Sequence, residues 1–136
     1  MAIEVTRQYL PLLDEEGRAA VNRLREQGVK IGMARLLWIR PFPSDDLRHA
    51  LRRVKAVGVV ETNLGLGGPT YGGILAPDVT AALYHAAHRP LVTSFMAGLG
   101  GETVPMTEFD WMAGKLGQAI ARGSVEKAAH WVGFEE

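Results

Sequence analysis

The sequence predicts an α/β fold in which a mostly parallel sheet carries helices on both faces. The first observation is that apolar segments of strand length alternate with segments whose apolar residues recur every three or four positions. The second is that the strand-like segments end in turns rich in glycine or proline. Alternating strands and helices build a parallel sheet between two helical layers, so we expect one three-layer α/β domain over residues 1–136.

The composition is that of an ordinary globular chain. Hydrophobic residues make up 47% of the 136 residues, and 15 basic side chains balance 15 acidic ones. A neutral chain has no general attraction to nucleic acid or to an anionic membrane, so we expect neither as a partner. The absence of cysteine excludes a disulfide, and a thiolate-held zinc ion or iron–sulfur cluster, from this chain. With no signal peptide and no apolar run of membrane-span length, we expect a cytoplasmic location.

The first elements are a weak strand, a helix and an apolar strand. In residues 1–13, apolar and polar residues alternate briefly before Pro11, so we expect a short strand or an extended arm. Asp14 is placed to cap a helix, and Gly28 is placed to end it. Residues 29–39 are largely apolar, which is typical of a buried strand.

A proline-rich turn and a second helix follow. The Arg-Pro-Phe-Pro turn at 40–43 removes two backbone donors and stops the preceding strand. Ser44 is predicted to cap the next helix. One face of that helix is apolar and carries Leu47, Ala50, Leu51 and Val54.

Residues 56–60 are predicted to form a buried strand that runs directly into the glycine-rich segment 61–69, ETNLGLGGP. The next helix begins near Pro77, where a missing N–H group is harmless, or is bent there. Its predicted apolar face carries Leu75, Val79, Ala82, Leu83 and Ala86.

The last part of the chain repeats the pattern. Residues 91–96 form a strand that ends in a second glycine-rich turn, 97–101. Thr107, with Asp110 in the reciprocal position, is predicted to cap the final helix, and Gly123 closes it. Its predicted apolar face carries Phe109, Met112, Leu116, Ala119 and Ile120. The tail at 124–136 is rich in apolar residues near its end, so we expect it to dock on a surface.

Three loops are expected at the carboxyl ends of the parallel strands, at 40–44, 61–73 and 97–104. In open α/β sheets this is the edge at which ligands or partners bind. Phosphate binding is weakly indicated, because the glycines after Asn63 match neither the dinucleotide-binding pattern nor the lysine-bearing P-loop. Three arginines could hold a phosphate group, but nearby acidic residues favour a solvated helix surface: Arg48, Arg52 and Arg53.

A metal site, a catalytic triad and a catalytic acid or base are also only weakly indicated. His85 and His88 form a close pair without a third ligand, so surface histidines are the better interpretation. Ser94 lies within a strand, and no histidine has a spacing that predicts a catalytic triad. Glu61 leaves a buried strand, so burial could raise its pKa; it could equally cap a neighbouring helix or pair with an arginine. We expect no catalytic residue and no metal ligand set in this chain.

Three linked motifs carry a family resemblance. They are GVKIGMARLLWIRPFPSDDLRHAL, then VKAVGVVETNLGLGGPTYGGIL, then PLVTSFMAGLGGETVPMTEF. In order and spacing they resemble the C-terminal domain of the alpha subunit of 2-oxoacid:ferredoxin oxidoreductases, the pyruvate synthase group. The resemblance covers about residues 28–136, and it implies a fold similar to the C-terminal domain of transketolases.

The resemblance implies a role in an oxidoreductase. Such enzymes convert a 2-oxoacid and coenzyme A into an acyl-CoA, carbon dioxide and two electrons for ferredoxin, using thiamine diphosphate, magnesium and iron–sulfur clusters. The family places these cofactors in other domains, or in beta, gamma and ferredoxin-like subunits. The resemblance therefore implies that this chain binds no cofactor alone and is a structural or assembly domain that shapes a subunit interface.

The resemblance places binding or interface residues on the three loops. They are Arg40, Phe42, Glu61, Asn63, Gly65, Gly67, Gly68, Gly98, Gly100 and Gly101. The family commonly carries Asp-Arg-Asn where this chain has Glu61-Thr62-Asn63, and its alpha subunits are several times longer. Two other interpretations stay open: a C-terminal domain of another transketolase-like thiamine enzyme, and an independent small-molecule-binding module.

Overall fold

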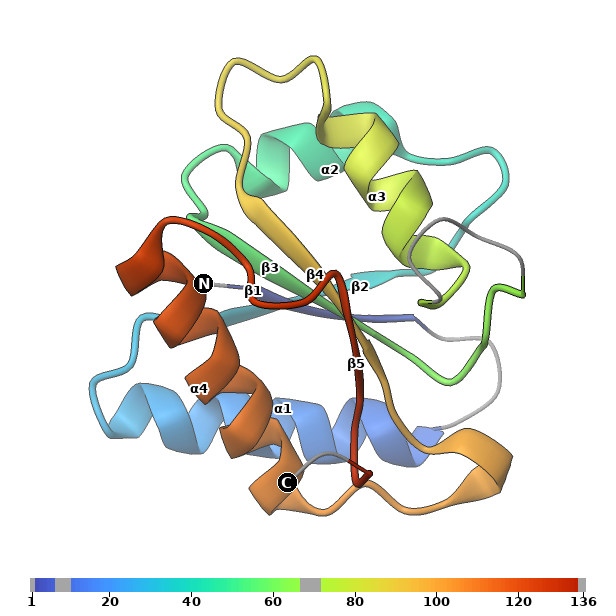
Figure 1. Cartoon of the computed structure of the whole chain (residues 1–136), viewed down its shortest axis with the longest axis vertical. Coiled ribbons are helices and arrows are strands. Elements are labelled where there is room, and N and C mark those ends of the chain that lie inside the picture. Colours follow the sequence, from blue (N-terminus) through green and yellow to red (C-terminus); the bar gives the residue numbers. More distant parts are fainter. Residues whose placement is uncertain (1, 7–10, 67–71, 135–136) are drawn as a thin grey trace.

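The computed structural model describes residues 2–6, 11–66 and 72–134 of the chain. Strands and helices alternate from the first element to the last (Figure 1). The elements are β1 (Ala2–Thr6), α1 (Pro11–Glu26), β2 (Gly32–Leu36), α2 (Ser44–Leu51), β3 (Ala56–Glu61), α3 (Leu75–Leu83), β4 (Leu91–Met96), a short 3₁₀ turn (Leu99–Gly101), α4 (Met106–Arg122) and β5 (Ala129–Trp131).

The sheet is parallel throughout the described residues. Its strand order is β2-β1-β3-β4-β5, and every neighbouring pair is parallel. The chain therefore moves outward from β1 in one direction, returns past it, and continues in the other direction. This is a doubly wound arrangement, whose loops leave the carboxyl ends of all strands at one edge. The predicted α/β class is confirmed.

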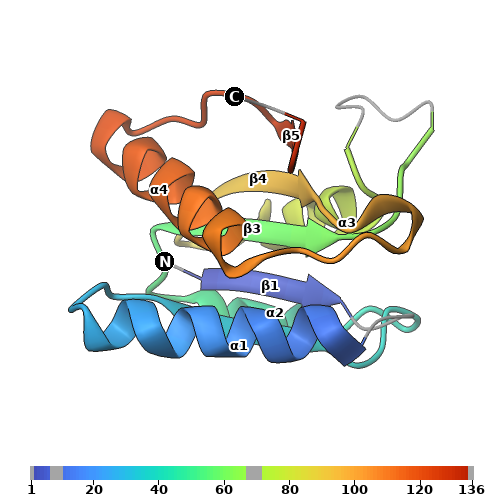
Figure 2. The same ribbon diagram turned by 90° about the horizontal axis from the view of Figure 1, so that it is seen from below.

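The helices form two outer layers. Helix α1 packs beside α4 on one face of the sheet, and α2 packs beside α3 on the other (Figures 1 and 2). Strand β3 lies between them and is buried along its whole length. Its Ala56 and Val60 belong to the core under α1 and α4, whereas Val57 and Val59 belong to the core under α2 and α3. This alternation is the period of two that a strand requires.

The apolar faces predicted for the last two helices are confirmed for most of their residues. In α3, Leu75, Val79, Ala82 and Leu83 are buried, while in α4 the buried residues are Phe109, Met112, Leu116 and Ala119. Pro77 lies in the first turn of α3, where its missing N–H group leaves no hydrogen bond unmade. Strand β4 has the bounds predicted for it.

The segment 29–39 is a correction. Its strand is shorter, Gly32–Leu36, and it lies at one edge of the sheet with mostly half-buried residues. Leu37 and Trp38, expected inside a buried strand, are 60% and 73% exposed. The apolar composition does not reflect burial within the chain, so another reason for these exposed side chains is needed.

The side-chain caps predicted for the starts of three helices are wrong, whereas Gly123 closes α4 as predicted. Helix α1 begins at Pro11, before Asp14. Ser44 is the first residue of α2, which has no side-chain cap, and Thr107 lies inside α4. Asp110 instead pairs with Arg23 of α1. Proline at or just before each of these helix starts fixes a suitable φ angle, and this replaces side-chain capping.

Two ends of the chain are better ordered than the sequence predicts. Residues 2–6 form β1, a strand inside the sheet, so the first strand is present. The tail contributes β5, which pairs with β4. Buried His130 of β5 stacks on Phe95 with ring centroids 5.3 Å apart and meets Trp111 edge-on at 5.5 Å. These ring contacts, together with the pairing to β4, hold the tail on the sheet.

Candidate functional site

The three predicted loops lie together at the carboxyl edge of the sheet. They follow β2, β3 and β4, on the side to which the strand arrows point (Figure 1). Backbone contacts join two of them, because the N–H of Ala97 donates to the carbonyl oxygen of Glu61 at 3.0 Å. The candidate site is therefore this edge, and Glu61 lies at its centre.

Glu61 is the last residue of β3, and its side chain is 1% exposed. The N–H of Leu75 donates to Oε1 at 2.9 Å, and the N–H of Ala76 donates to Oε2 at 3.1 Å. These are first-turn N–H groups of α3, which have no partner within the helix. Glu61 thus caps α3 from the preceding strand, the alternative that the sequence left open.

Burial controls the protonation of Glu61. Desolvation raises the pKa of its carboxyl group above the ordinary value of 4.5. The bonds from the backbone of α3 lower the pKa and so oppose this effect, and the nearby charge of Asp78 adds to the increase. The carboxylate faces backbone donors rather than solvent, so its geometry suits a structural cap better than an acid or base that meets a substrate.

The same geometry bears on phosphate binding. The first turn of a helix attracts anions because its N–H groups and its dipole favour negative charge. In α3 the carboxylate of Glu61 already takes this position. A phosphate group would have to displace a buried side chain of the protein itself.

The glycines of the β3–α3 loop allow it to pack closely on itself. The N–H of Gly65 donates to the carbonyl oxygen of Gly72 at 2.9 Å, and a Cβ on Gly65 would lie 3.1 Å from that oxygen. A Cβ on Gly73 would lie 1.8 Å from Cδ of Glu61. Glycine at 73 is therefore required by the buried carboxylate. Gly67 and Gly68, also predicted as site residues, lie outside the described residues.

Arg40 and Phe42 connect the β2–α2 loop to the same helix. The Arg40 guanidinium donates to Oδ2 of Asp78, in the first turn of α3, at 2.9 Å. The Arg40 side chain is 66% exposed, so this ion pair adds little stability. Half-buried Phe42 packs against the core under α2 and α3. Arg40 and Glu61 thus both contact the start of α3, Arg40 through the side chain of Asp78 and Glu61 through backbone N–H groups.

The remaining predicted residues lie nearer the surface. Asn63 is exposed. Gly98, Gly100 and Gly101 have positive φ angles of 68°, 71° and 86°, which glycine adopts readily. A Cβ on Gly98 would lie 3.6 Å from the Thr62 side chain, so this turn touches the segment that follows Glu61.

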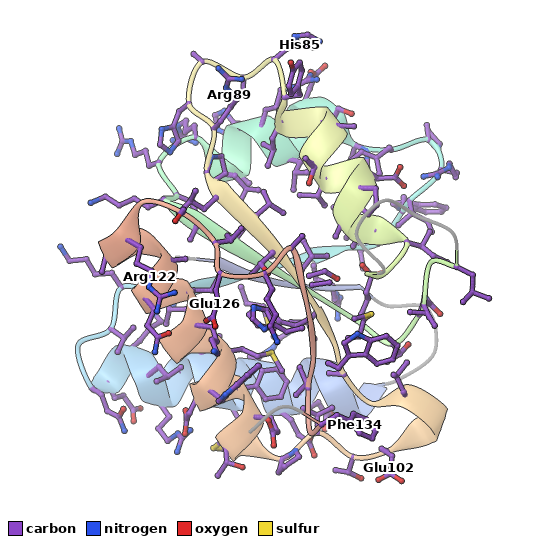
Figure 3. The ribbon with its side chains drawn as sticks, in the orientation of Figure 1. His85, Arg89, Glu102, Arg122, Glu126 and Phe134 are labelled. Carbon is purple, nitrogen blue, oxygen red and sulfur yellow. The ribbon has the colours of Figure 1, made fainter. Side chains whose placement is uncertain are left out.

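A pocket of about 330 Å³ opens beside the Gly98 turn. Its walls come from the β4–α4 connection and from the residues after β5, and Figure 3 shows Glu102 and Phe134 at this corner. Two acidic and three apolar residues are among those that line it: Glu102, Glu108, Val104, Val132 and Phe134. Sequence reasoning missed this pocket because it did not place the tail beside the turn; the apolar residues near the end of the tail were the available signal.

The other candidates lie elsewhere. Exposed His85 and His88 follow α3, at the opposite edge of the sheet, and His88 Nε2 lies 2.7 Å from the carbonyl oxygen of Val54. Arg48 donates to the carbonyl oxygen of Ala82 and to Asp45. Ser94 is buried, and its hydroxyl accepts the N–H of Gly73 at 3.3 Å.

The described residues contain neither a group of metal ligands nor a membrane-spanning helix. Within 2–6, 11–66 and 72–134, no three His, Cys, Asp or Glu side chains form a group that could hold a metal ion. No helix in this part of the chain is long and apolar enough to cross a membrane.

The family match and the similar proteins all belong to one group of oxidoreductases. Residues 12–109, well over half of the chain, match the family described as pyruvate:ferredoxin oxidoreductase core domain II. The pyruvate synthase subunit PorA of Pyrococcus horikoshii is 35% identical over 116 residues, which cover 85% of this chain and 29% of that protein. The ketoisovalerate oxidoreductase subunit VorA of Pyrococcus furiosus is 33% identical over 114 residues, 84% of this chain and 28% of that protein.

A solved structure supports the fold. A split-gene transketolase, described as an inactive beta4 tetramer, superposes with a TM-score of 0.54 at 16% identity and covers 89% of this chain and 38% of that one. The predicted likeness to a transketolase-type domain is confirmed at the level of the fold. The chain spans less than a third of the length of the curated relatives it matches.

Proposed function

Because the chain belongs to the pyruvate:ferredoxin oxidoreductase core domain II family, we propose that it is a structural and assembly domain of a 2-oxoacid:ferredoxin oxidoreductase. The whole enzyme would convert a 2-oxoacid and coenzyme A into an acyl-CoA, carbon dioxide and reduced acceptor, in the cytoplasm. The observation that carries the proposal is the match to the PorA and VorA subunits. The match covers most of this chain but less than a third of each of those proteins. The rest of the enzyme would then supply the catalytic parts.

The chemistry of the chain's own residues supports this division. A sequence without cysteine offers no thiolate to an iron–sulfur cluster. The described residues contain no group of acidic or histidine side chains suited to magnesium, and the start of α3 is filled by Glu61. Nothing in the described residues is suited to thiamine diphosphate or magnesium, and the sequence has no cysteine for a cluster, so we assign these cofactors to other domains or to beta, gamma and ferredoxin-like subunits.

The chain would contribute rigidity at the interface. Glu61 fixes the start of α3 to the end of β3, and Arg40 connects the β2–α2 loop to the same helix turn. A helix start held in this way is fixed before a partner binds, so less conformational entropy is lost on assembly. An independent small-molecule-binding module is less well supported, because the chain's own carboxylate occupies the start of α3, the helix that follows the glycine-rich loop.

The test is reconstitution with the cognate subunits. The chain is co-expressed with the remaining part of the cognate alpha subunit and with the beta, gamma and ferredoxin-like polypeptides, and coenzyme A-dependent 2-oxoacid oxidation is followed by viologen reduction. We expect co-purification and turnover with the partners, and no turnover by the chain alone. Turnover by the pure chain, or its failure to join the complex, would contradict the proposal.

A further inference from the structure

The exposed large hydrophobic side chains of the described residues are unevenly distributed. Seven of eight lie at the carboxyl edge of the sheet, after a strand, at the last residue of β5 or at the start of a helix. They are Leu37, Trp38, Leu66, Ile74, Met106, Trp131 and Phe134. Trp38 is 73% exposed, Phe134 is 77% exposed and Leu66 is 86% exposed. We call these seven residues the apolar edge.

The opposite edge has a different character. Of the eight residues, Tyr84 alone lies there. Its surface is basic, because two turns carry exposed cationic side chains and are held side by side by the Leu91 N–H donating to the carbonyl oxygen of Lys55 at 2.9 Å. The cationic residues are Arg52, Arg53, Lys55 and Arg89, and Figure 3 shows Arg89 near His85 at this end. Such an edge is suited to solvent, so the two ends of the sheet differ in what they can contact.

The pocket beside the Gly98 turn continues the apolar edge. Val104 and Val132 are buried in its wall, and Phe134 lies at the same opening. Glu102 and Glu108 also line it, and neither carboxylate forms an ion pair or hydrogen bond with a residue that the structure describes. A pocket of 330 Å³ with apolar walls and two carboxylates suits a long basic side chain, whose methylenes pack while its cation meets the acids.

We propose that the apolar edge is the surface on which this chain docks to the part of the oxidoreductase alpha subunit that lies beyond the matched segment. The proposal rests on the proposed function. More than two-thirds of the length of PorA and VorA lies outside the match, so those proteins carry a large polypeptide able to cover this edge. Seven large apolar side chains exposed at one edge of the sheet, with one at the other edge, indicate an interaction surface. The docking surface of the partner is mainly apolar and presents a basic side chain to the pocket.

Because the chain has no cysteine, single cysteines can report burial at chosen positions. Leu66→Cys and Phe134→Cys probe the apolar edge, and Tyr84→Cys is the matched control at the opposite edge. Each variant is labelled with a maleimide, alone and after co-purification with the cognate alpha-subunit polypeptide from which the segment matching this chain is removed, and the labelled peptides are measured by mass spectrometry. We expect labelling at the two edge positions to slow at least about tenfold in the complex, and labelling at Tyr84→Cys to stay unchanged.

The outcomes separate this proposal from the proposed function. If the complex forms but both edge cysteines remain fully reactive, the docking surface lies elsewhere, while the assembly role stands. If the edge is protected in the chain alone and size-exclusion chromatography shows a dimer, a second copy covers it and the proposal is wrong. If an edge variant alone fails to join the complex, although its melting temperature matches that of Tyr84→Cys, the proposal is supported. If the unmodified chain forms no complex, the proposed function itself fails.

Discussion

Glu61 both stabilises the start of α3 and restricts which residue can stand at position 73. A carboxylate with 1% exposure persists because the backbone of α3 supplies N–H donors. The same placement requires glycine at 73, because any Cβ there would overlap the carboxyl group. The sequence offered two of these facts, an acid after a buried strand and glycines before a helix, but not that they touch. Contact between residues twelve apart depends on the path of the loop.

The first prediction concerns Gly73. Gly73→Ala should lower the free energy of unfolding by about 2 kcal/mol or more, since a Cβ would lie 1.8 Å from Cδ of Glu61 and the loop must move. Urea unfolding measures the change. Gly32→Ala is the control, because a Cβ at Gly32 meets no atom within 4 Å.

A double-mutant cycle tests whether Glu61 is the cause. In the Glu61→Ala background the clash disappears, so Gly73→Ala should cost at least about 1 kcal/mol less than in the wild type. Equal costs in both backgrounds would show that the backbone at 73, rather than the carboxylate, requires glycine.

The second prediction concerns pH. The native carboxyl group of Glu61 has a pKa above 4.5, so the folded state holds its proton more tightly than the unfolded state does. This contribution to stability is fully present below pH 4.5 and is lost as the pH rises through the native pKa. Glu61→Gln lacks the titration and keeps an oxygen acceptor. The stability of the wild type minus that of Glu61→Gln should therefore fall as the pH rises from 4.5.

The measurement is urea unfolding of both proteins across this pH range. Groups common to the two proteins cancel in the difference, which isolates the carboxyl group. A difference that stays constant would mean that the bonds from α3 balance desolvation, and one that grows with pH would mean that they outweigh it; either result contradicts the prediction.

At the scale of elements, apolar patterns predicted the layers well and the ends of elements poorly. Strands β3 and β4 were predictable because all residues of β3 and the last four residues of β4 are buried, as their apolar composition indicates. The prediction of a buried strand over residues 29–39 was wrong for the opposite reason. Leu37 and Trp38 are apolar yet exposed at the edge of the sheet, and an apolar pattern alone does not show whether a residue is buried within the chain. The pocket beside Gly98 could not be predicted either, because it forms between residues over thirty apart in sequence.

The third prediction concerns the end of α4. Gly123 has a φ of 75° and caps the helix, so Gly123→Ala should cost about 1 kcal/mol of stability, although a Cβ there meets no atom within 4 Å. Gly114, inside the same helix, is equally unobstructed and has no positive φ. Gly114→Ala should therefore stabilise the protein by about 0.5–1 kcal/mol. Thermal unfolding compares the two, and changes of the same sign would contradict the assignment of Gly123 as the cap.

At the scale of the whole molecule, the net charge is zero although the two edges of the sheet differ in character. One edge of the sheet is apolar and carries an acid-lined pocket, while the other is basic and faces away from it. The bulk composition averages these two ends and so reveals neither. The chain is thus polarised along its strands, which suits a domain with one end in an assembly and one end in solvent.

The last prediction is that the isolated chain gains no stability from a nucleotide. In doubly wound domains an anionic ligand binds at a helix start on the carboxyl edge. Here the start of α3 is taken by Glu61, which is held by two N–H donors. Coenzyme A or ADP at about 1 mM should therefore move the melting temperature by less than about 1 °C, whereas a ligand at a hundred times its Kd stabilises by about 2.7 kcal/mol and moves it by several degrees. The basic edge could attract phosphates weakly, and about 0.15 M salt screens such surface attraction while sparing a buried site. A rise that survives this salt would identify a true nucleotide site and favour a binding module over an assembly domain.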